Sequence, residues 1–433
     1  MKKRGQITTF IIVAIVLVVA VLLFVFVNRL VSQPSGEPGI PDSTSVKRLT
    51  ETCMKDIIRD GAQQLMVGGG YIDAEKFFPD LLIRQDSYLK MPMKLPYWFY
   101  RGQDRMPTKR DMEAQLEQYL NKNLPGCLAG FSAFDAFLDV KQHGPLQSQV
   151  IINREDISTT LDLTLDVHDK LKSKDEVVSG FVTTTPTMLG KLYALASILM
   201  KTENKQAYLE FVTDDIIASS NAFPYEGMQF TCKPLRWTTY QLNQELRSRL
   251  APNLLLMRFD NTYAPLTGIP YYDKLYRFHV TDQDFSDVSV NVVYNPDWKL
   301  SMQVYPSRGS IVYPIEMQST ADTPVSFLLS ALGGVCIKLF HHKYTVQYPV
   351  LYRVADITTG ESFYFATPVL MKNNQANRHA DVKDLKFQTD IEGSRRFCSN
   401  VTLETDYALN RIDDRMIDNG EIEVPKDRQS INV

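Results

Sequence analysis

The chain has 433 residues, of which 44% are hydrophobic and 22% are charged, so it is long enough to form a large folded domain. Residues 32–433 carry 43 basic and 50 acidic side chains, a formal net charge of −7, because four basic residues and no acidic one precede Ser32. We find no Lys/Arg cluster and no basic stripe interleaved with aromatic residues. This acidic balance predicts that nucleic acid is not a partner.

An apolar segment near the N-terminus predicts a single transmembrane helix. Residues 10–27 are all apolar, and residues 7–27 span about 30 Å at roughly 1.5 Å per residue, which matches the core of a bilayer. Basic residues 2–4 precede the segment, whereas Arg29 alone follows it closely. We therefore expect a cytoplasmic N-terminus and an extracellular ectodomain. A cleaved signal peptide is the alternative, but no small-residue cleavage site follows, which favours a retained anchor.

A polar stretch follows the anchor (residues 1–31). Residues 32–45 contain three prolines, which predicts an extended stalk. A helix should begin at Ser45, which can cap it, and end at the three glycines 68–70.

The next segments complete a helix-plus-hairpin module over residues 46–170. A second helix is predicted over 108–124, with Cys127 just after its end, and strands over 149–152 and 157–167. In the longer strand, alternate residues should share one buried face: Ile157, Thr159, Leu161, Leu163, Leu165 and Val167.

A TTTP turn at 183–186 leads into a predicted helical module, residues 186–260. Apolar spacing of three and four residues predicts its helices over 187–201, 206–219 and 239–250.

The remainder of the chain predicts a β-rich module over 261–405 and a polar C-terminal tail over 406–433. Strand-like runs alternate with turn residues, at 285–293, 300–306, 344–354 and 362–371. The predicted fold class is therefore α+β: an N-terminal transmembrane helix followed by an extracytoplasmic ectodomain of helices packed on antiparallel sheets.

The five cysteines are widely spaced, so the sequence contains no CxxC redox pair and no zinc knuckle. Outside a cell they can form disulfides, and chain order suggests Cys53 with Cys127 and Cys336 with Cys398. Buried reduced cysteines are the alternative. Asn400 lies in the only N-glycosylation sequon, so it is a candidate site on an external surface.

Catalytic motifs are missing from the sequence. No histidine has a zincin-spaced partner, and no GxSxG, SxxK or GxGxxG occurs. Adjacent His341 and His342 would face opposite sides of a strand, so we expect one buried and one exposed histidine instead of a shared metal. We predict no catalytic residue, no metal site, no cofactor and no enzymatic activity.

Two pairs of neighbouring acids could serve a glycosidase, which needs two carboxyl groups across a cleft. They are Asp214 with Asp215 and Asp413 with Asp414. Acids adjacent in sequence are more often solvated, and this is the interpretation we favour.

The aromatic run from Tyr97 to Tyr100, followed by Arg101, has two interpretations. Aromatic faces bury large areas, so the run could form a platform for a sugar or a protein partner. Filling the hydrophobic core is the alternative, and the more common use of such residues.

The N-terminal residues KKRGQITTFIIVAIV resemble the class III signal peptide of archaeal type IV pilins and archaellins. This resemblance implies cleavage by a prepilin peptidase between Gly5 and Gln6. Such pilins place a Glu five residues into the mature chain, where this chain has Phe10. Segments at 46–72, 112–127, 189–217, 230–237 and between 336 and 374 also resemble a group of uncharacterised archaeal signal-anchored surface proteins, a similarity that implies a location but no activity.

Together these features predict a non-enzymatic, membrane-anchored cell-surface protein with a structural or contact (adhesion) role. A subunit of a type IV pilus-like filament is the first alternative, and an anchored enzyme acting on envelope polymers is the second. The expected partners are membrane lipid through residues 7–27 and, on the outside, surface proteins, glycans or other copies of the chain.

Overall fold

The computed structural model is a mixed α+β structure that describes residues 41–78, 82–85, 93–100, 102–230, 235–266, 268–316, 337–379, 402–404 and 430–432. The chain divides into two compact units, each built from separate segments. Among the described residues, the first unit contains 41–54, 123–147 and 161–182, and the second contains the others. The contiguous modules expected over 46–170, 186–260 and 261–405 remain predictions.

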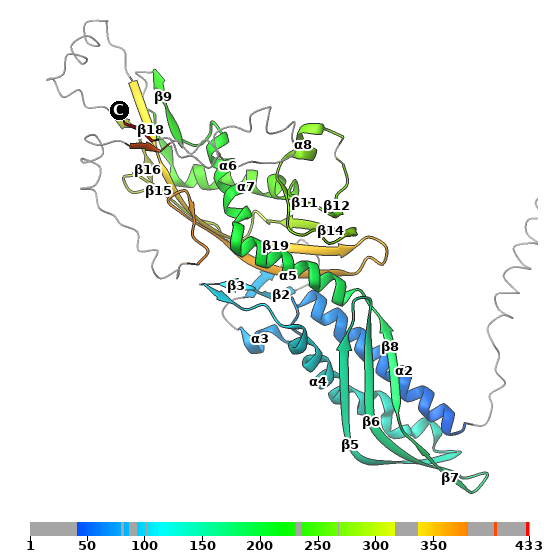
Figure 1. The fold of residues 1–433 in the computed structure, drawn as a ribbon. Helices are drawn as coiled ribbons and strands as arrows, with labels where there is room; N and C mark the ends of the chain where they lie inside the picture. Colours follow the sequence, from blue (N-terminus) through cyan, green and yellow to red (C-terminus); the bar gives the residue numbers. More distant parts are fainter. Residues whose placement is uncertain are drawn as a thin grey trace, which may run out of the picture. The chain divides into compact units, whose positions relative to one another are not determined.

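The helices are labelled in Figure 1. They are α2 (Ser43–Val67), α3 (Ala74–Phe77), α4 (Lys109–Leu128), α5 (Leu189–Gln206), α6 (Tyr208–Ser219), α7 (Thr239–Leu255) and α8 (Pro270–Lys274), with a 3-10 helix over Ala129–Phe134.

The longer strands form two main sheets. They are β5 (Leu138–Ile152), β6 (Asp156–Asp169), β7 (Lys174–Val178), β8 (Phe181–Pro186), β14 (Phe285–Val293), β15 (Ser301–Tyr305), β19 (Lys343–Asp356) and β20 (Ser362–Lys372).

The other strands are shorter. They are β1 (Leu82–Gln85), β2 (Met93–Pro96), β3 (Phe99–Tyr100), β4 (Gln103–Asp104), β9 (Glu226–Phe230), β10 (Trp237–Thr238), β11 (Arg258–Phe259), β12 (Thr262–Tyr263), β13 (Arg277–Phe278), β16 (Ile311–Val312), β17 (Ile315–Glu316), β18 (Ile337–His341), β21 (Gln375–Ala376), β22 (Thr402–Glu404) and β23 (Ser430–Asn432).

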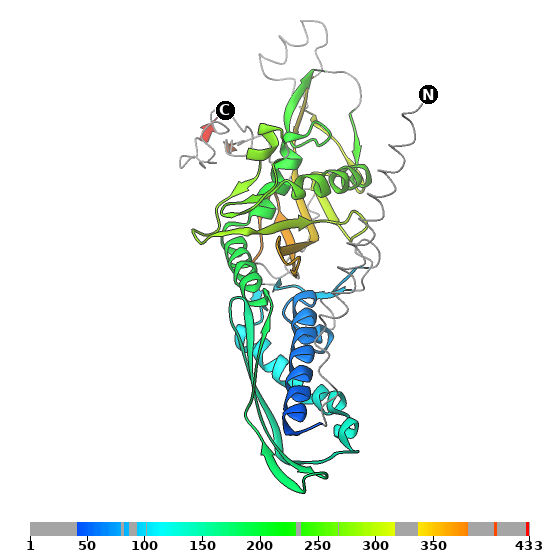
Figure 2. The same ribbon diagram turned by 90° about the vertical axis from the view of Figure 1, so that its right-hand side faces the viewer.

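A four-stranded sheet in the order β5-β6-β7, with β8 also paired to β6, contributes to both units. Its central strand β6 confirms the predicted alternation, because the six residues expected on one face are all at most 2% exposed. In the first unit, the end of β6 pairs antiparallel with β7, from Leu165 opposite Val178 to Asp169 opposite Lys174. The start of α2 lies alongside these strands (Figure 2) and buries Val46.

A six-stranded sheet in the second unit has the order β12-β14-β19-β20-β21, and β15 pairs with the first part of β19. The β19–β20 pairing is antiparallel from Val346 opposite Met371 to Ala355 opposite Ser362. The short pairs β11–β13 and β12–β14 are parallel. The strand-like runs expected in this part of the sequence are confirmed as β14, β15, β19 and β20.

Helices α5, α6 and α7 cover one face of this sheet (Figure 1). Alternate residues of β19 point to that face, and the hydroxyl groups of Tyr348 and Thr213 of α6 lie 2.7 Å apart. The packed β19 residues are at most 1% exposed: Tyr344, Val346, Tyr348, Val350, Tyr352 and Val354. This aromatic and branched face is the core of the second unit.

Local chemistry explains the helix ends. After α2, Gly69 and Gly70 adopt positive φ angles of 67° and 86°, and the Gly70 N–H donates to Leu65, as expected for a glycine stop. Helix α7 begins with a capping box in which the Thr238 hydroxyl and the Gln241 side chain each accept from the other's backbone N–H.

Several expected boundaries are wrong. Helix α2 begins two residues earlier than expected, and Asp42 supplies the cap in place of Ser45, because the Asp42 carboxylate accepts the Ser45 N–H at 3.0 Å. Helix α4 continues through Cys127 to Leu128, since Leu124 and Leu128 extend its buried stripe past Pro125.

Two strand assignments also change. The expected TTTP turn is instead the end of β8, where Thr183 and Thr185 are buried and Pro186 occupies the last position. Branched threonines favour strands, and a terminal proline removes no interior hydrogen bond. Strand β5 begins at Leu138, eleven residues before the expected start. The prediction missed this part of the strand because the stretch is polar, mostly exposed and without periodic burial.

Candidate functional site

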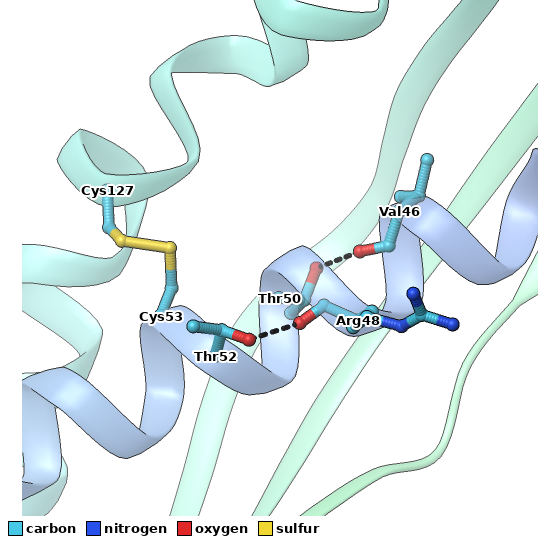
Figure 3. The surroundings of a disulfide bond; sticks show 6 residues. All are labelled: Val46, Arg48, Thr50, Thr52, Cys53 and Cys127. Carbon is cyan, nitrogen blue, oxygen red and sulfur yellow. Dashed lines mark hydrogen bonds between the residues drawn. A yellow bond between two sulfur atoms is a disulfide. The ribbon is translucent and has the colours of Figure 1, made fainter. Parts of the chain in front are cut away.

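A disulfide joins α2 to α4 within the first unit. Cys53 and Cys127 are separated by 74 residues in sequence and by 5.9 Å between Cα atoms (Figure 3). This is the pairing that chain order suggested. On the same helix turn, the Thr50 and Thr52 hydroxyls donate to the backbone carbonyls of Val46 and Arg48 at 3.0 and 2.8 Å, which satisfies these polar groups locally.

The run from Tyr97 to Tyr100 serves two purposes. Trp98 is fully buried: its ring stacks on Phe365 of β20 at 4.5 Å, and its indole N–H donates to the Gly69 carbonyl at 2.8 Å. Phe99 is also buried. Core packing is therefore the correct interpretation for the two central residues of the run.

Tyr97 and Tyr100 belong instead to a half-buried layer that we call the aromatic–arginine stack: Tyr97, Tyr100, Arg105, Phe78 and Tyr71. The two tyrosine rings are stacked at 5.6 Å with an interplanar angle of 17°. The Arg105 guanidinium lies 5.5 Å from the Tyr100 ring centre and 5.5 Å from that of Phe78. Tyr71 packs edge-on against Phe78 at 5.4 Å.

Backbone pairing holds the stack in place. Tyr97 bridges Ala366 of β20, and the Arg105 N–H donates to the Trp98 carbonyl at 2.7 Å. The Tyr71 hydroxyl donates to the Arg105 carbonyl at 2.9 Å. The backbone of the stack is thus anchored beside the buried Trp98 and to β20 of the main sheet.

The only formal charge within the stack is positive. Burial, and then the neighbouring Tyr100, raise the pKa of Tyr97 to about 12, so its phenol stays neutral. Among the described residues, the Arg105 guanidinium donates to Gln103 at 3.0 Å and has no carboxylate partner. Lys76, whose ammonium lies 5.9 Å from the ring of half-exposed Phe77, adds a second cation. Such an arrangement suits recognition of an anion.

A second polar cluster is buried between helices and sheet. Arg378 donates to the carboxyl groups of Glu203 on α5 and Glu210 on α6 at 3.2 and 2.9 Å, and to the Thr367 hydroxyl on β20 at 2.8 Å. The three ionisable side chains are at most 2% exposed. The sequence offers no signal for this cluster, because its arginine lies 175 residues from Glu203.

The acid pair on α6 does not form two free carboxyl groups. Asp215 accepts from the Tyr276 hydroxyl at 2.5 Å, and burial raises the pKa of Asp215. Asp214 accepts from the Tyr225 hydroxyl at 3.1 Å. Both acids are buried, so our expectation that they are solvated is wrong.

The adjacent histidines behave as expected. His342 is fully buried, and its Nε2 lies 3.1 Å from the Tyr313 carbonyl oxygen, whereas the His341 side chain is 42% exposed. Within the described ranges, no group of three or more His, Cys, Asp or Glu side chains could hold a metal ion.

Several predicted positions lie outside the described residues: the anchor, the Gly5–Gln6 cleavage site, Asp413 with Asp414, and Asn400. The same holds for the expected Cys336–Cys398 pair. From residue 41 onward, none of the described helices has the length and hydropathy needed to cross a bilayer.

Comparisons of the chain with protein-family models, with curated proteins and with solved structures find no match.

Proposed function

We propose that this chain is a non-enzymatic, membrane-anchored protein of the cell surface whose α+β ectodomain has a structural or contact role. The Cys53–Cys127 disulfide is the observation that carries the proposal. Disulfides persist in oxidising surroundings outside the cytosol and are rare within it. A disulfide between α2 and α4 therefore supports an external location.

The N-terminal sequence supports the same location. Residues 7–27 are long and apolar enough to span a bilayer, and the basic residues before them favour a cytoplasmic N-terminus. The ectodomain would then carry the disulfide on the oxidising side. The aromatic–arginine stack supplies a partly exposed surface suited to contact.

Surface digestion of intact cells tests the proposed location. We expect added protease to remove the ectodomain from whole cells while leaving a cytoplasmic marker intact, because the folded bulk lies outside. In parallel, alkylation under denaturing conditions should modify Cys53 and Cys127 only after reduction. An ectodomain that stays protected on intact cells, or both thiols alkylated without reduction, would reject the proposal.

A filament subunit is the second candidate, favoured by the resemblance of residues around Gly5 and Gln6 to a prepilin cleavage site. In a filament the apolar helices would pack against one another, so cysteine cross-linking at Val13 or Val16 should trap long ladders. The native mass should then begin at Gln6. An intact mass that corresponds to a chain starting at Met1, together with no cross-linked oligomers, would exclude this candidate.

A further inference from the structure

We propose that the aromatic–arginine stack, together with Lys76, binds an anionic glycan, a carbohydrate that carries carboxylate or sulfate groups. This inference deepens the contact role proposed above and depends on it for the choice of glycan as the ligand. It names the surface and the chemistry of the partner.

The first argument is preorganisation. A free arginine side chain loses considerable rotational freedom when it binds an anion. The Arg105 guanidinium lies 5.5 Å from the ring centres of Tyr100 and Phe78 and donates to Gln103 at 3.0 Å, so these contacts restrict the side chain before a ligand binds. A guanidinium presents a fork of N–H groups that matches a carboxylate or sulfate.

The second argument is unbalanced charge. Some other exposed basic side chains of this unit have acidic partners: Arg59 pairs with Asp56 at 2.9 Å, and Arg110 pairs with Glu117 at 3.0 Å. Neither Arg105 nor Lys76 pairs with a carboxylate in the part of the chain that the structure describes. Burial raises the pKa of Tyr71 and Tyr97, so these two phenols add no negative charge beside Arg105.

The sequence around Arg105 has an excess of basic residues that the search for basic clusters missed. Residues 84–110 contain seven basic and two acidic side chains, a local charge of +5 within an ectodomain of net charge −7, and they include the aromatic run 97–100. The basic residues are spaced among aromatic and apolar ones instead of forming a run. A sliding charge window would have located them.

The ring geometry favours a glycan over single-stranded nucleic acid. Base binding needs free aromatic faces for successive bases. Here the rings of the stack are half-buried or buried, and Tyr97 stacks on Tyr100, so these rings do not offer a row of exposed faces. Phe77, 50% exposed, offers an apolar face beside Lys76, enough for one sugar ring.

Binding of defined oligosaccharides by the full chain in detergent tests the proposal. We expect a heparin octasaccharide to bind at near-physiological salt and neutral maltooctaose not to bind. Replacing the guanidinium with a neutral amide in Arg105→Gln should weaken binding by roughly 10-fold, the loss expected for one charged hydrogen-bonded contact. Lys76→Gln, at an exposed position, should weaken binding by roughly 3-fold, as a point charge on the surface would.

Arg59→Gln is the matched control. It removes the same charge from an exposed, already paired arginine of the same unit, so it should change affinity by less than about 2-fold. Equal losses in Arg105→Gln and Arg59→Gln would overturn the proposal, as would no heparin binding by the unmodified chain. Tighter binding of a single-stranded oligonucleotide of equal charge would overturn the glycan assignment. If Arg105→Gln loses its native circular dichroism, Lys76→Gln decides alone, and an unchanged affinity rejects the site.

This test is independent of the proposed location, because the purified chain binds or fails to bind wherever it resides in the cell. Failure of heparin binding with an accessible ectodomain would reject the ligand alone. Binding with a protected ectodomain would reject the location alone.

Discussion

At the scale of single residues, the Arg378 cluster illustrates how a folded interior selects a protonation state. Burial, opposed by Arg378 and reinforced by Glu210, raises the pKa of Glu203 to about 8. Glu203 is then protonated at neutral pH. Its proton avoids the cost of a further buried carboxylate charge.

The shifted pKa predicts how stability depends on pH. The folded state holds the Glu203 proton from its ordinary pKa of 4.5 up to about 8, whereas the unfolded state releases it above 4.5. This contribution to stability is complete below pH 4.5 and is lost as pH rises to about 8, with a slope of up to about 1.4 kcal/mol per pH unit. Glu203→Gln should remove that slope in denaturant titrations between pH 5 and 8.

Asp56→Asn is the control for this prediction, because the Asp56 side chain is 60% exposed and its removal should leave the pH dependence intact. A slope that is equal in Glu203→Gln and in the unmodified chain would show that Glu203 does not hold the proton.

At the scale of secondary-structure elements, α2 and α4 are held together by packing and by one covalent bond. The buried stripe of α4 runs from Met112 to Leu128 at helical spacing. The Cys53–Cys127 disulfide closes a long loop, so it restricts the unfolded chain more than a short-range link would.

Removing this disulfide should lower the free energy of unfolding. Replacing Cys53 and Cys127 together with serine should cost about 4 kcal/mol in the chain-entropy model. Guanidinium unfolding, with and without a reductant, measures the loss. The reductant should destabilise the unmodified chain by more than it destabilises the double variant. A double variant as stable as the unmodified chain would remove the structural role of the bond.

Strand β6 makes a second prediction at this scale. Leu163 is 1% exposed on the buried face, whereas its neighbour Asp162 points outward. Leu163→Ala should cost roughly 2 to 5 kcal/mol through lost contacts and a cavity, and Asp162→Ala less than about 0.5 kcal/mol. Equal losses in thermal unfolding would mean that β6 does not present one face to the core.

At the scale of the whole molecule, charge and hydropathy are unevenly distributed along the chain. The basic tip and apolar stretch occupy residues 1–31, and the remaining residues carry a net charge of −7. The apolar surface of a stretch of this length must be buried away from water, and the hydrocarbon core of a bilayer can bury all of it.

Phase partition in a cloud-point detergent tests the proposed anchor. The full chain should enter the detergent-rich phase, and a chain that begins at Ser32 should stay in the aqueous phase, because the ectodomain is acidic. Recovery of the full chain from the aqueous phase would contradict the anchor.

Much of the secondary structure follows from local sequence patterns. Burial repeats every two residues along β6 and every three or four along α2 and α4, and such patterns are independent of distant residues. Glycines 68–70 end α2 for reasons of backbone geometry alone. The wrong assignments fall where this local information is weak, at the mostly polar β5 and at the threonine-rich β8.

The contacts within the two charge-bearing sites required the fold. Arg378 meets Glu203 across 175 residues of sequence, and Arg105 lies 5.5 Å from the rings of Tyr100 on β3 and of Phe78, which follows α3. Periodicity reports which face of an element is buried, because that depends on the element's own geometry. Which side chains then meet across elements depends on how the elements pack, and no periodic pattern records that.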